Sequence, residues 1–222
     1  MVQASRPLFR EWHFVLAVVS QFLYCAAQIG VFSFFINYLK DPRCMPALPA
    51  WLADLLPTDM KYYHDDAWHI TDYCAGAMLS LAFVFFTIGR FSGSALLRFA
   101  PAHRVLGIYA LVNVILMGLV FLSLGWVSVV ALILSFFFTS IMYPTHFALA
   151  IRGLGERAKL ELSWMLTAIV GGAIMPMLMG ALADRYSMRV GFLMPMACFA
   201  GIMAYGFGWR RLYHHDVEPT GE

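Results

Sequence analysis

Uncharged hydrogen-bonding side chains interrupt the apolar stretch QFLYCAAQIGVFSFFINYL, residues 21–39. Gln21 and Gln28 are seven residues apart, which is two helical turns, and Tyr24 lies between them on the same face. Amides exchange hydrogen bonds with hydroxyl groups, while aromatic rings cover C–H faces. The pattern therefore fits a surface that holds a neutral polyhydroxyl molecule. It fits equally well amides that join neighbouring helices.

Two later apolar stretches contain residues that bend a helix or let it approach a neighbour. One contains Tyr143-Pro144-Thr145-His146, where the proline removes a backbone donor and favours a kinked helix beside a cavity. The other reads IVGGAIMPMLMGALA, in which glycines and a proline permit close helix contact and bending. The residues expected to give this flexibility are Pro144, Gly171, Gly172 and Pro176, and Asn113 adds an amide in another apolar stretch.

Charged side chains are almost absent from the middle of the apolar stretches. Asp72 lies near the outer end of one, and His146 lies about one turn from the inner end of another. Proton coupling requires a group that changes charge where water is excluded, usually a carboxylate. The chain has no such carboxylate at mid-membrane depth. His146 is then either a partial candidate for this role or a histidine that is hydrogen-bonded near the interface.

The sequence predicts no metal, cofactor or catalytic site. The methionines near Pro176 fill gaps more often than they bind copper, and no two histidines share a mid-membrane depth as haem ligation requires. The adjacent His214 and His215 of the tail point to different sides. Cys44 is the one loop cysteine, and a bridge to Cys74 is weighed against ordinary buried thiols. Without a nucleophile beside a base, or a phosphate loop, an enzyme is the weakest interpretation.

Composition indicates which elements position these residues. Hydrophobic residues make up 61% of the 222 residues and charged residues 13%, which is typical of an integral membrane protein. About 20 apolar residues span the hydrocarbon core as a helix, and continuous runs such as VVALILSFFF exclude the alternating pattern of a barrel. We therefore predict an all-α membrane protein with six transmembrane helices. They cover residues 12–39, 70–89, 105–124, 127–149, 163–183 and 190–208.

The six spans are expected to form one transmembrane domain, residues 12–208. Residues 1–11 form a cytoplasmic segment without the features of a cleaved signal peptide, and residues 209–222 form a cytoplasmic tail. The long loop 40–69 is expected to be external. Within it, the segment ALPAWLADLLP forms either a short helix at the membrane interface or an irregular loop.

The basic residues predict that both termini are cytoplasmic. With both ends inside, ten Lys and Arg residues lie on the inner side and five on the outer side, which together make the 15 in the chain. The turn GALADRYS, residues 180–187, indicates the opposite, because its Asp-Arg pair is typical of cytoplasmic turns. We give the count more weight than this one turn.

Four blocks of the sequence, in order, carry a family resemblance. They are QFLYCAAQIGVFSFFINYL, then GRF at 89–91, SIMYPTHFALAIRGLG at 140–155 and IVGGAIMPMLMG at 169–180. Together they resemble the carboxyl-terminal half of a major facilitator superfamily transporter, and specifically the L-fucose:proton symporter family of sugar permeases. The spans also fall into two triplets, separated at residues 124–126, and inverted three-helix repeats are a recurring plan in transporters.

The resemblance implies half of a major facilitator fold, with two inverted three-helix repeats, in a bacterial inner membrane. It implies uptake of a neutral hexose of the fucose, galactose or glucose type by alternating access, with the proton as coupling ion. Members of the family are about twice this length, and the acidic residues associated with proton coupling lie in the amino-terminal half. The expected partner is therefore such a six-helix half or a second copy of this chain, and no nucleic acid is expected.

Because the sugar site of such permeases forms between the halves, the resemblance implies that this chain supplies one wall. The residues expected in that wall are Gln21, Tyr24, Gln28, Asn37, Asn113 and Tyr143. A second set, Gly89, Arg90, Arg98 and Arg104, is similar to the cytoplasmic gating loop of the superfamily, although the usual Asp is missing.

The half length leaves three explanations open. The chain is a fragment or split gene product that pairs with an amino-terminal half, or a homodimer, or a remnant without transport, and we favour the first. The alternative function is a non-transporting membrane scaffold or sensor derived from a transporter half.

Overall fold

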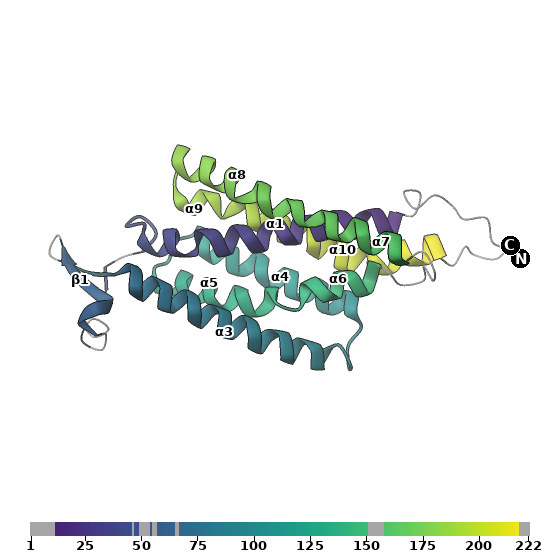
Figure 1. Cartoon of the computed structure of the whole chain (residues 1–222), viewed down its shortest axis with the longest axis horizontal. Coiled ribbons are helices and arrows are strands. Elements are labelled where there is room, and N and C mark those ends of the chain that lie inside the picture. Colours follow the sequence, from purple (N-terminus) through teal and green to yellow (C-terminus); the bar gives the residue numbers. More distant parts are fainter. Residues whose placement is uncertain are drawn as a thin grey trace, which may run out of the picture.

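Six helical segments of this chain are long and apolar enough to cross a membrane, which confirms the six-span prediction. They were identified in a computed structural model that describes residues 12–45, 47–48, 54, 57–64, 67–150 and 158–217. The segments lie side by side in one bundle (Figure 1). Their bounds are Phe14–Lys40, Asp72–Leu96, Ala102–Phe121, Trp126–Ala150, Leu162–Arg185 and Met188–Arg210.

Helix α1 (Trp12–Lys40) lies at the centre of the bundle and packs against α10 (Leu193–Val217), α8 (Gly171–Arg185) and α3 (Asp72–Leu96). Its large side chains Tyr24, Phe35 and Tyr38 are fully buried. The Tyr38 hydroxyl donates to the Val120 carbonyl oxygen at 2.7 Å, which joins α1 to the end of the third span. The first span therefore contacts most of the other spans and is placed to position a site.

The second span extends further than we predicted. The span was expected to end at Gly89, with GRF in the following loop, but α3 continues to Leu96 and contains Gly89, Arg90 and Phe91. A Cβ atom at Gly89 would lie 2.4 Å from the Phe137 carbonyl oxygen. The glycine is thus the residue that permits close packing of α3 against α5 (Trp126–Thr139). Because no proline follows until Pro101, nothing in the sequence ends the helix at 89.

The third and sixth spans pair along their length. Helix α4 (Ala102–Phe121) packs against α10, and also against α5. The turn between α4 and α5 contains Gly125 at φ 64°, a conformation that favours glycine. The Ser128 hydroxyl donates to the Leu119 carbonyl oxygen and accepts from the Leu124 amide, so that it satisfies backbone groups at both helix ends. This turn is where the two predicted triplets meet.

The fourth span is two helices rather than one. Helix α5 ends at Thr139, a turn follows at residues 140–141, and α6 (Met142–Ala150) completes the span. Pro144 explains the position of the break, because its ring would clash with the carbonyl of residue 140 in a continuous helix. The proline itself lies in the first turn of α6, where its missing amide hydrogen leaves no helix bond unmade. The helix is therefore interrupted one turn before the proline, and the bending role of Pro144 stays a prediction.

The fifth span is interrupted as well. It consists of α7 (Ala158–Thr167), η4 (Ala168–Val170) and α8, which contains Pro176. A Cβ atom at Gly171 would lie 2.4 Å from the Phe22 carbonyl oxygen, so this glycine permits α8 to cross closely over α1. The short helix α9 (Met188–Gly191) then leads into α10. The start of α1 and the end of α10 lie at the same end of the bundle (Figure 1).

A small β-hairpin projects from the opposite end of the bundle (Figure 1). The 3-10 turn η2 (Thr58–Met60) precedes strand β1 (Lys61–His64), which pairs antiparallel with β2 (Ala67–Ile70). Opposite pairs such as Tyr62 with His69 and Tyr63 with Trp68 bring aromatic rings together across the strands. The sequence indicated only an external loop here. The segment interpreted as an interfacial helix falls mostly on residues outside the described part of the chain.

Candidate functional site

The polar residues of α1 separate into buried and accessible groups. Gln21 and Tyr24 are fully buried, Gln28 is half-buried and Asn37 is exposed. Within the part of the chain that the structure describes, the side-chain amides of Gln28 and Asn37 have no hydrogen-bond partner. An amide at membrane depth without a partner is costly unless water, a ligand or another protein supplies one. Gln28 and Asn37 are therefore the α1 amides that can serve a binding surface.

Tyr24 connects α1 with both parts of the fourth span. Its hydroxyl donates to the Thr139 carbonyl oxygen at 3.3 Å, at the end of α5. Its ring centroid lies 5.9 Å from that of Tyr143 and 5.6 Å from that of His146, both in α6. Tyr143 is half-buried and also packs on Phe147 one turn later, at 4.9 Å between ring centroids. The break in the fourth span thus places Tyr143 directly against the central helix.

Arg90 of α3 is close enough to this pair to interact electrostatically with the Tyr24 and Tyr143 side chains. Arg90 is itself exposed. The arginine was expected in a cytoplasmic loop, and the structure instead places it on a helix beside two residues of the predicted wall.

An aromatic cluster adjoins Gln28 and was not part of the predicted site. Phe32, one turn after Gln28, stacks on Phe136 with 4.2 Å between ring centroids and an interplanar angle of 17°. Phe83 and Phe86 of α3 meet the Phe32 ring edge-on at 5.2 and 5.8 Å. Three helices thus contribute rings beside a free amide, which is the combination that suits a molecule with both hydroxyl groups and C–H faces. The run AFVFF in the sequence could have indicated the α3 rings, but not their packing against α1.

Gln21 and Asn113 lie inside the bundle. The Gln21 amide nitrogen contacts the Cys25 sulfur at 3.6 Å, and the Asn113 amide nitrogen donates to the Tyr109 carbonyl oxygen in its own helix at 3.1 Å. The amide oxygens of both residues are buried without a partner among the described residues. This placement favours the interpretation of these two amides as groups within the helix packing, and their role in the wall stays a prediction.

The remaining predicted residues lie at one end of the bundle or in helix contacts. Arg98 and Arg104 are exposed, in the turn after α3 and the first turn of α4. A Cβ atom at Gly172 would lie 2.0 Å from the Ile29 Cδ1 atom, so Gly172, like Gly171, is a contact between α8 and α1. The gating and flexing roles of these residues stay predictions.

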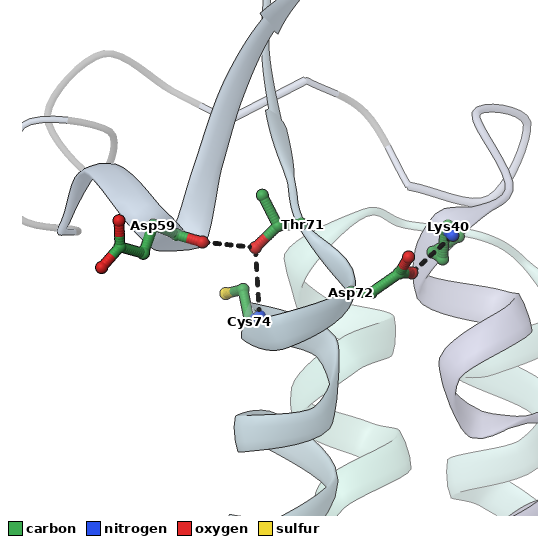
Figure 2. Close-up of polar contacts among 5 residues, drawn as sticks. All are labelled: Lys40, Asp59, Thr71, Asp72 and Cys74. Carbon is green, nitrogen blue, oxygen red and sulfur yellow. Dashed lines mark hydrogen bonds and ion pairs between the residues drawn. The ribbon is translucent and has the colours of Figure 1, made fainter.

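The hairpin end of the bundle is held by polar contacts (Figure 2). Thr71 precedes α3 and accepts from the Cys74 amide at 3.3 Å, while its hydroxyl donates to the Asp59 carbonyl oxygen at 2.8 Å. Lys40, the last residue of α1, forms an ion pair with Asp72, the first residue of α3. The Thr71 contacts join the hairpin loop to α3, and the exposed ion pair adds a weaker link between α3 and α1.

No group of three or more His, Cys, Asp or Glu side chains that could hold a metal occurs in the described residues. The four cysteines are buried free thiols, so the structure has no bridge between Cys44 and Cys74. Burial raises the pKa of the Cys44 thiol, and the nearby Asp41 carboxylate raises it further. A protonated thiol is a poor nucleophile, so Cys44 is expected to be unreactive.

Comparisons with known proteins gave consistent relatives, although no family model matches the chain. It is 36% identical over 194 residues to a glucose/galactose transporter of Brucella abortus, covering 87% of this chain and 42% of that protein. It is 34% identical over 200 residues to the L-fucose-proton symporter of Escherichia coli, covering 89% and 40%. The chain spans less than half the length of these curated relatives.

Solved structures agree with the sequence relatives. A crystal structure of the E. coli fucose:proton symporter FucP matches with a TM-score of 0.78 and 31% identity, over 91% of this chain and 44% of that chain. A crystal structure of FucP described as a major facilitator superfamily transporter in the outward conformation matches with a TM-score of 0.79 and 30% identity, over 94% and 47%. The six spans of the present chain therefore have the fold of about half of that transporter.

Proposed function

This chain is a homologue of about half of a major facilitator superfamily transporter, and from that premise we propose that it is the carboxyl-terminal half of a secondary active sugar transporter. The proposed substrate is a neutral hexose of the fucose, galactose or glucose type. Transport proceeds by alternating access, in which two six-helix halves rock around a site between them. The proposed coupling ion is the proton.

The observation that carries this proposal is the difference between two faces of the bundle. Apart from Arg104 in the first turn of α4, every exposed side chain of α4 and α5 is apolar, as lipid contact requires. The accessible side chains of α1 and α3 instead include polar ones along the spans. These are Gln28, Ser33, Asn37, Ser80, Thr87 and Arg90. A face of this composition suits an aqueous cavity or a protein partner better than lipid.

Burial also supports a partner. In the most apolar part of spans 72–96 and 162–185, only 22% and 33% of the residues are buried within the chain. The corresponding share is 44% to 56% in the other four spans. Helix α3 packs only lightly on α1, whereas α4 and α10 pack along their length. A second six-helix half would cover the surface of the two least buried spans. This is why we favour a paired half over a chain that acts alone.

The chemistry of the accessible face supports a sugar. Gln28 and Asn37 supply amides without partners, Tyr143 supplies a phenol, and the Phe32 cluster supplies ring surfaces. Hydroxyl groups of a hexose both donate and accept, which matches amides and phenols, and its C–H faces pack on aromatic rings. An uncharged lining also disfavours charged substrates, because a buried charge needs a counter-charge.

Proton coupling is proposed to depend on the other half. Among the described residues, the acidic side chains of the spans lie only at the ends, as Asp72 and Asp184 do. A carboxylate that titrates in a desolvated position is the usual proton carrier of such transporters. This chain is therefore expected to contribute sugar contacts and movement, while its partner contributes the proton site.

The test is uptake in proteoliposomes that contain the chain together with an amino-terminal six-helix half. We expect saturable uptake of one of the three labelled hexoses that increases when a proton gradient is imposed. A mannitol-loaded control and a protein-free liposome control measure leak. No saturable uptake of any hexose, with both halves inserted and folded, would refute the proposal.

A further inference from the structure

A hydrogen bond joins the fourth span to the first, between two residues that are not part of the proposed sugar wall. We propose that the bond between His146 and Ser20 positions Tyr143 against Tyr24 and so sets the sugar affinity of the site. This inference rests on the proposed function. His146 is on this view a positioning residue, since it is fully buried and acts through the tyrosines.

The protonation of the imidazole follows from its two partners. Nδ1 lies 2.8 Å from the Met142 carbonyl oxygen, and Nε2 lies 2.7 Å from the Ser20 Oγ atom. A carbonyl oxygen can only accept, so Nδ1 carries the hydrogen and donates it. Nε2 of the neutral ring then accepts from the Ser20 hydroxyl. Both nitrogens are satisfied in one tautomer, and the ring has no freedom to turn without losing a buried bond.

The position of His146 in the fold gives this bond its influence. His146 lies three residues after Tyr143 in α6, a helix of nine residues that the turn at 140–141 separates from α5. Because the helix is interrupted at residues 140–141, α6 is less tightly coupled to α5 than the turns of one continuous helix are to each other. Its placement against α1 depends on side-chain contacts, and the 2.7 Å bond to Ser20 is shorter than the 3.3 Å bond from Tyr24 to Thr139.

Aromatic contacts transmit the position of the imidazole to the wall. The Tyr24 ring lies against both His146 and Tyr143, with centroid distances of 5.6 and 5.9 Å. The ring of Tyr205 in α10 is also close to the imidazole, at 6.2 Å between centroids and an interplanar angle of 8°. The imidazole is thus in contact distance of rings from both α1 and α10. If it loses the bond to Ser20, α6 can shift relative to α1, and Tyr143 shifts with it.

Three variants separate this role from simple packing. His146→Gln places an amide near the Nε2 position and can keep the bond to Ser20, whereas His146→Asn places one near Nδ1 and keeps only the bond to the Met142 carbonyl. Ser20→Ala removes the same interhelical bond by deleting a single oxygen. Each is measured in proteoliposomes with an amino-terminal half, as the hexose concentration that gives half-maximal counterflow, together with the midpoint of thermal unfolding.

We expect His146→Asn and Ser20→Ala to raise the half-saturating hexose concentration about two- to tenfold, the range that one hydrogen bond supplies. His146→Gln should stay within about twofold of the wild type. The double variant Ser20→Ala/His146→Asn should lose no more than either single variant, because both remove one bond.

Two results would overturn the inference without touching the proposed function. An unchanged half-saturating concentration in a folded Ser20→Ala protein would show that the bond is only part of the packing, and this variant decides if His146→Asn does not fold. An equal loss in His146→Gln and His146→Asn would show that the Ser20 bond is not the cause. A wild-type protein without any hexose counterflow would refute the proposed function first, and the inference with it.

Discussion

The ring centroid of Tyr24 lies 5.9 Å from that of Tyr143, at an interplanar angle of 56°, so side chains from the first and fourth spans meet inside the bundle. Tyr24 is fully buried, and its hydroxyl is bonded to the Thr139 carbonyl oxygen. Tyr143 is half-buried, and its side chain has no hydrogen-bond partner among the described residues. We therefore expect the two tyrosines to differ in role, with Tyr143 available to a ligand and Tyr24 supporting its position.

This difference predicts unequal effects of removing each hydroxyl. Tyr143→Phe should raise the half-saturating hexose concentration about two- to tenfold, because one hydrogen bond to the sugar is lost. Tyr24→Phe should change that concentration by less than about twofold, because its hydroxyl faces the protein. Counterflow in proteoliposomes with both halves measures both. Equal effects of the two substitutions would contradict the expected difference in role between Tyr143 and Tyr24.

The two α1 glutamines give a second matched pair. Gln28→Leu should weaken hexose binding about three- to tenfold with little change in the midpoint of unfolding, since its amide has no partner in the described part of the chain. Gln21→Leu should leave the half-saturating concentration unchanged, because the side chain is fully buried. A loss of affinity in Gln21→Leu with none in Gln28→Leu would reverse the assignment of the accessible face.

The spans were predictable from the sequence, because a membrane imposes about 20 apolar residues on each of them. Their internal breaks were less so. Pro144 predicted a kink, yet the end of α5 at Thr139 depends on the clash of the proline ring one turn earlier. The hairpin was not predicted, because its pairing of Tyr63 with Trp68 lies in a loop that also contains four prolines.

The candidate site was predictable only in part. The amides and Tyr143 were visible in the sequence as polar groups in apolar surroundings. The sequence did not show which of them face outward. Helix α1 is apolar on nearly all sides, so its hydrophobic periodicity does not distinguish buried from accessible faces. The stacking of Phe32 on Phe136 joins positions 104 residues apart, and only tertiary packing brings them together.

Two glycines of α3 should respond in opposite ways to a methyl group. Gly89→Ala should destabilise the protein by about 1 to 3 kcal/mol, because its Cβ atom would meet the Phe137 carbonyl oxygen at 2.4 Å. Gly76→Ala should be neutral or stabilise the helix by up to about 1 kcal/mol, since nothing lies within 4 Å of the added atom. Unfolding in mixed detergent micelles measures both. A tolerated Gly89→Ala would mean that α3 and α5 are further apart.

The contacts at the hairpin end predict a ranking of two neighbouring substitutions (Figure 2). Thr71→Ala should cost about 0.5 to 2 kcal/mol, because it removes the cap of α3 and the bond to the Asp59 carbonyl. Asp72→Asn should cost less than about 1 kcal/mol, because the ion pair with Lys40 is solvent-exposed. Thr71→Ser keeps the hydroxyl and serves as control. A larger loss in Asp72→Asn than in Thr71→Ala would show that the ion pair holds the helices.

The orientation of the chain can be read from two exposed positions at opposite ends of the bundle. Phe99 lies in the turn between α3 and α4 and Tyr63 lies in β1, with 88% and 58% of their surfaces exposed, while all four native cysteines are buried. If both termini are cytoplasmic, a membrane-impermeant maleimide added to intact cells should label Tyr63→Cys and spare Phe99→Cys. Disrupting the cells should then expose Phe99→Cys to the reagent, which controls for its reactivity. Labelling of Phe99→Cys in intact cells, with Tyr63→Cys protected, would place the hairpin inside the cell. It would contradict the orientation predicted from the count of basic residues.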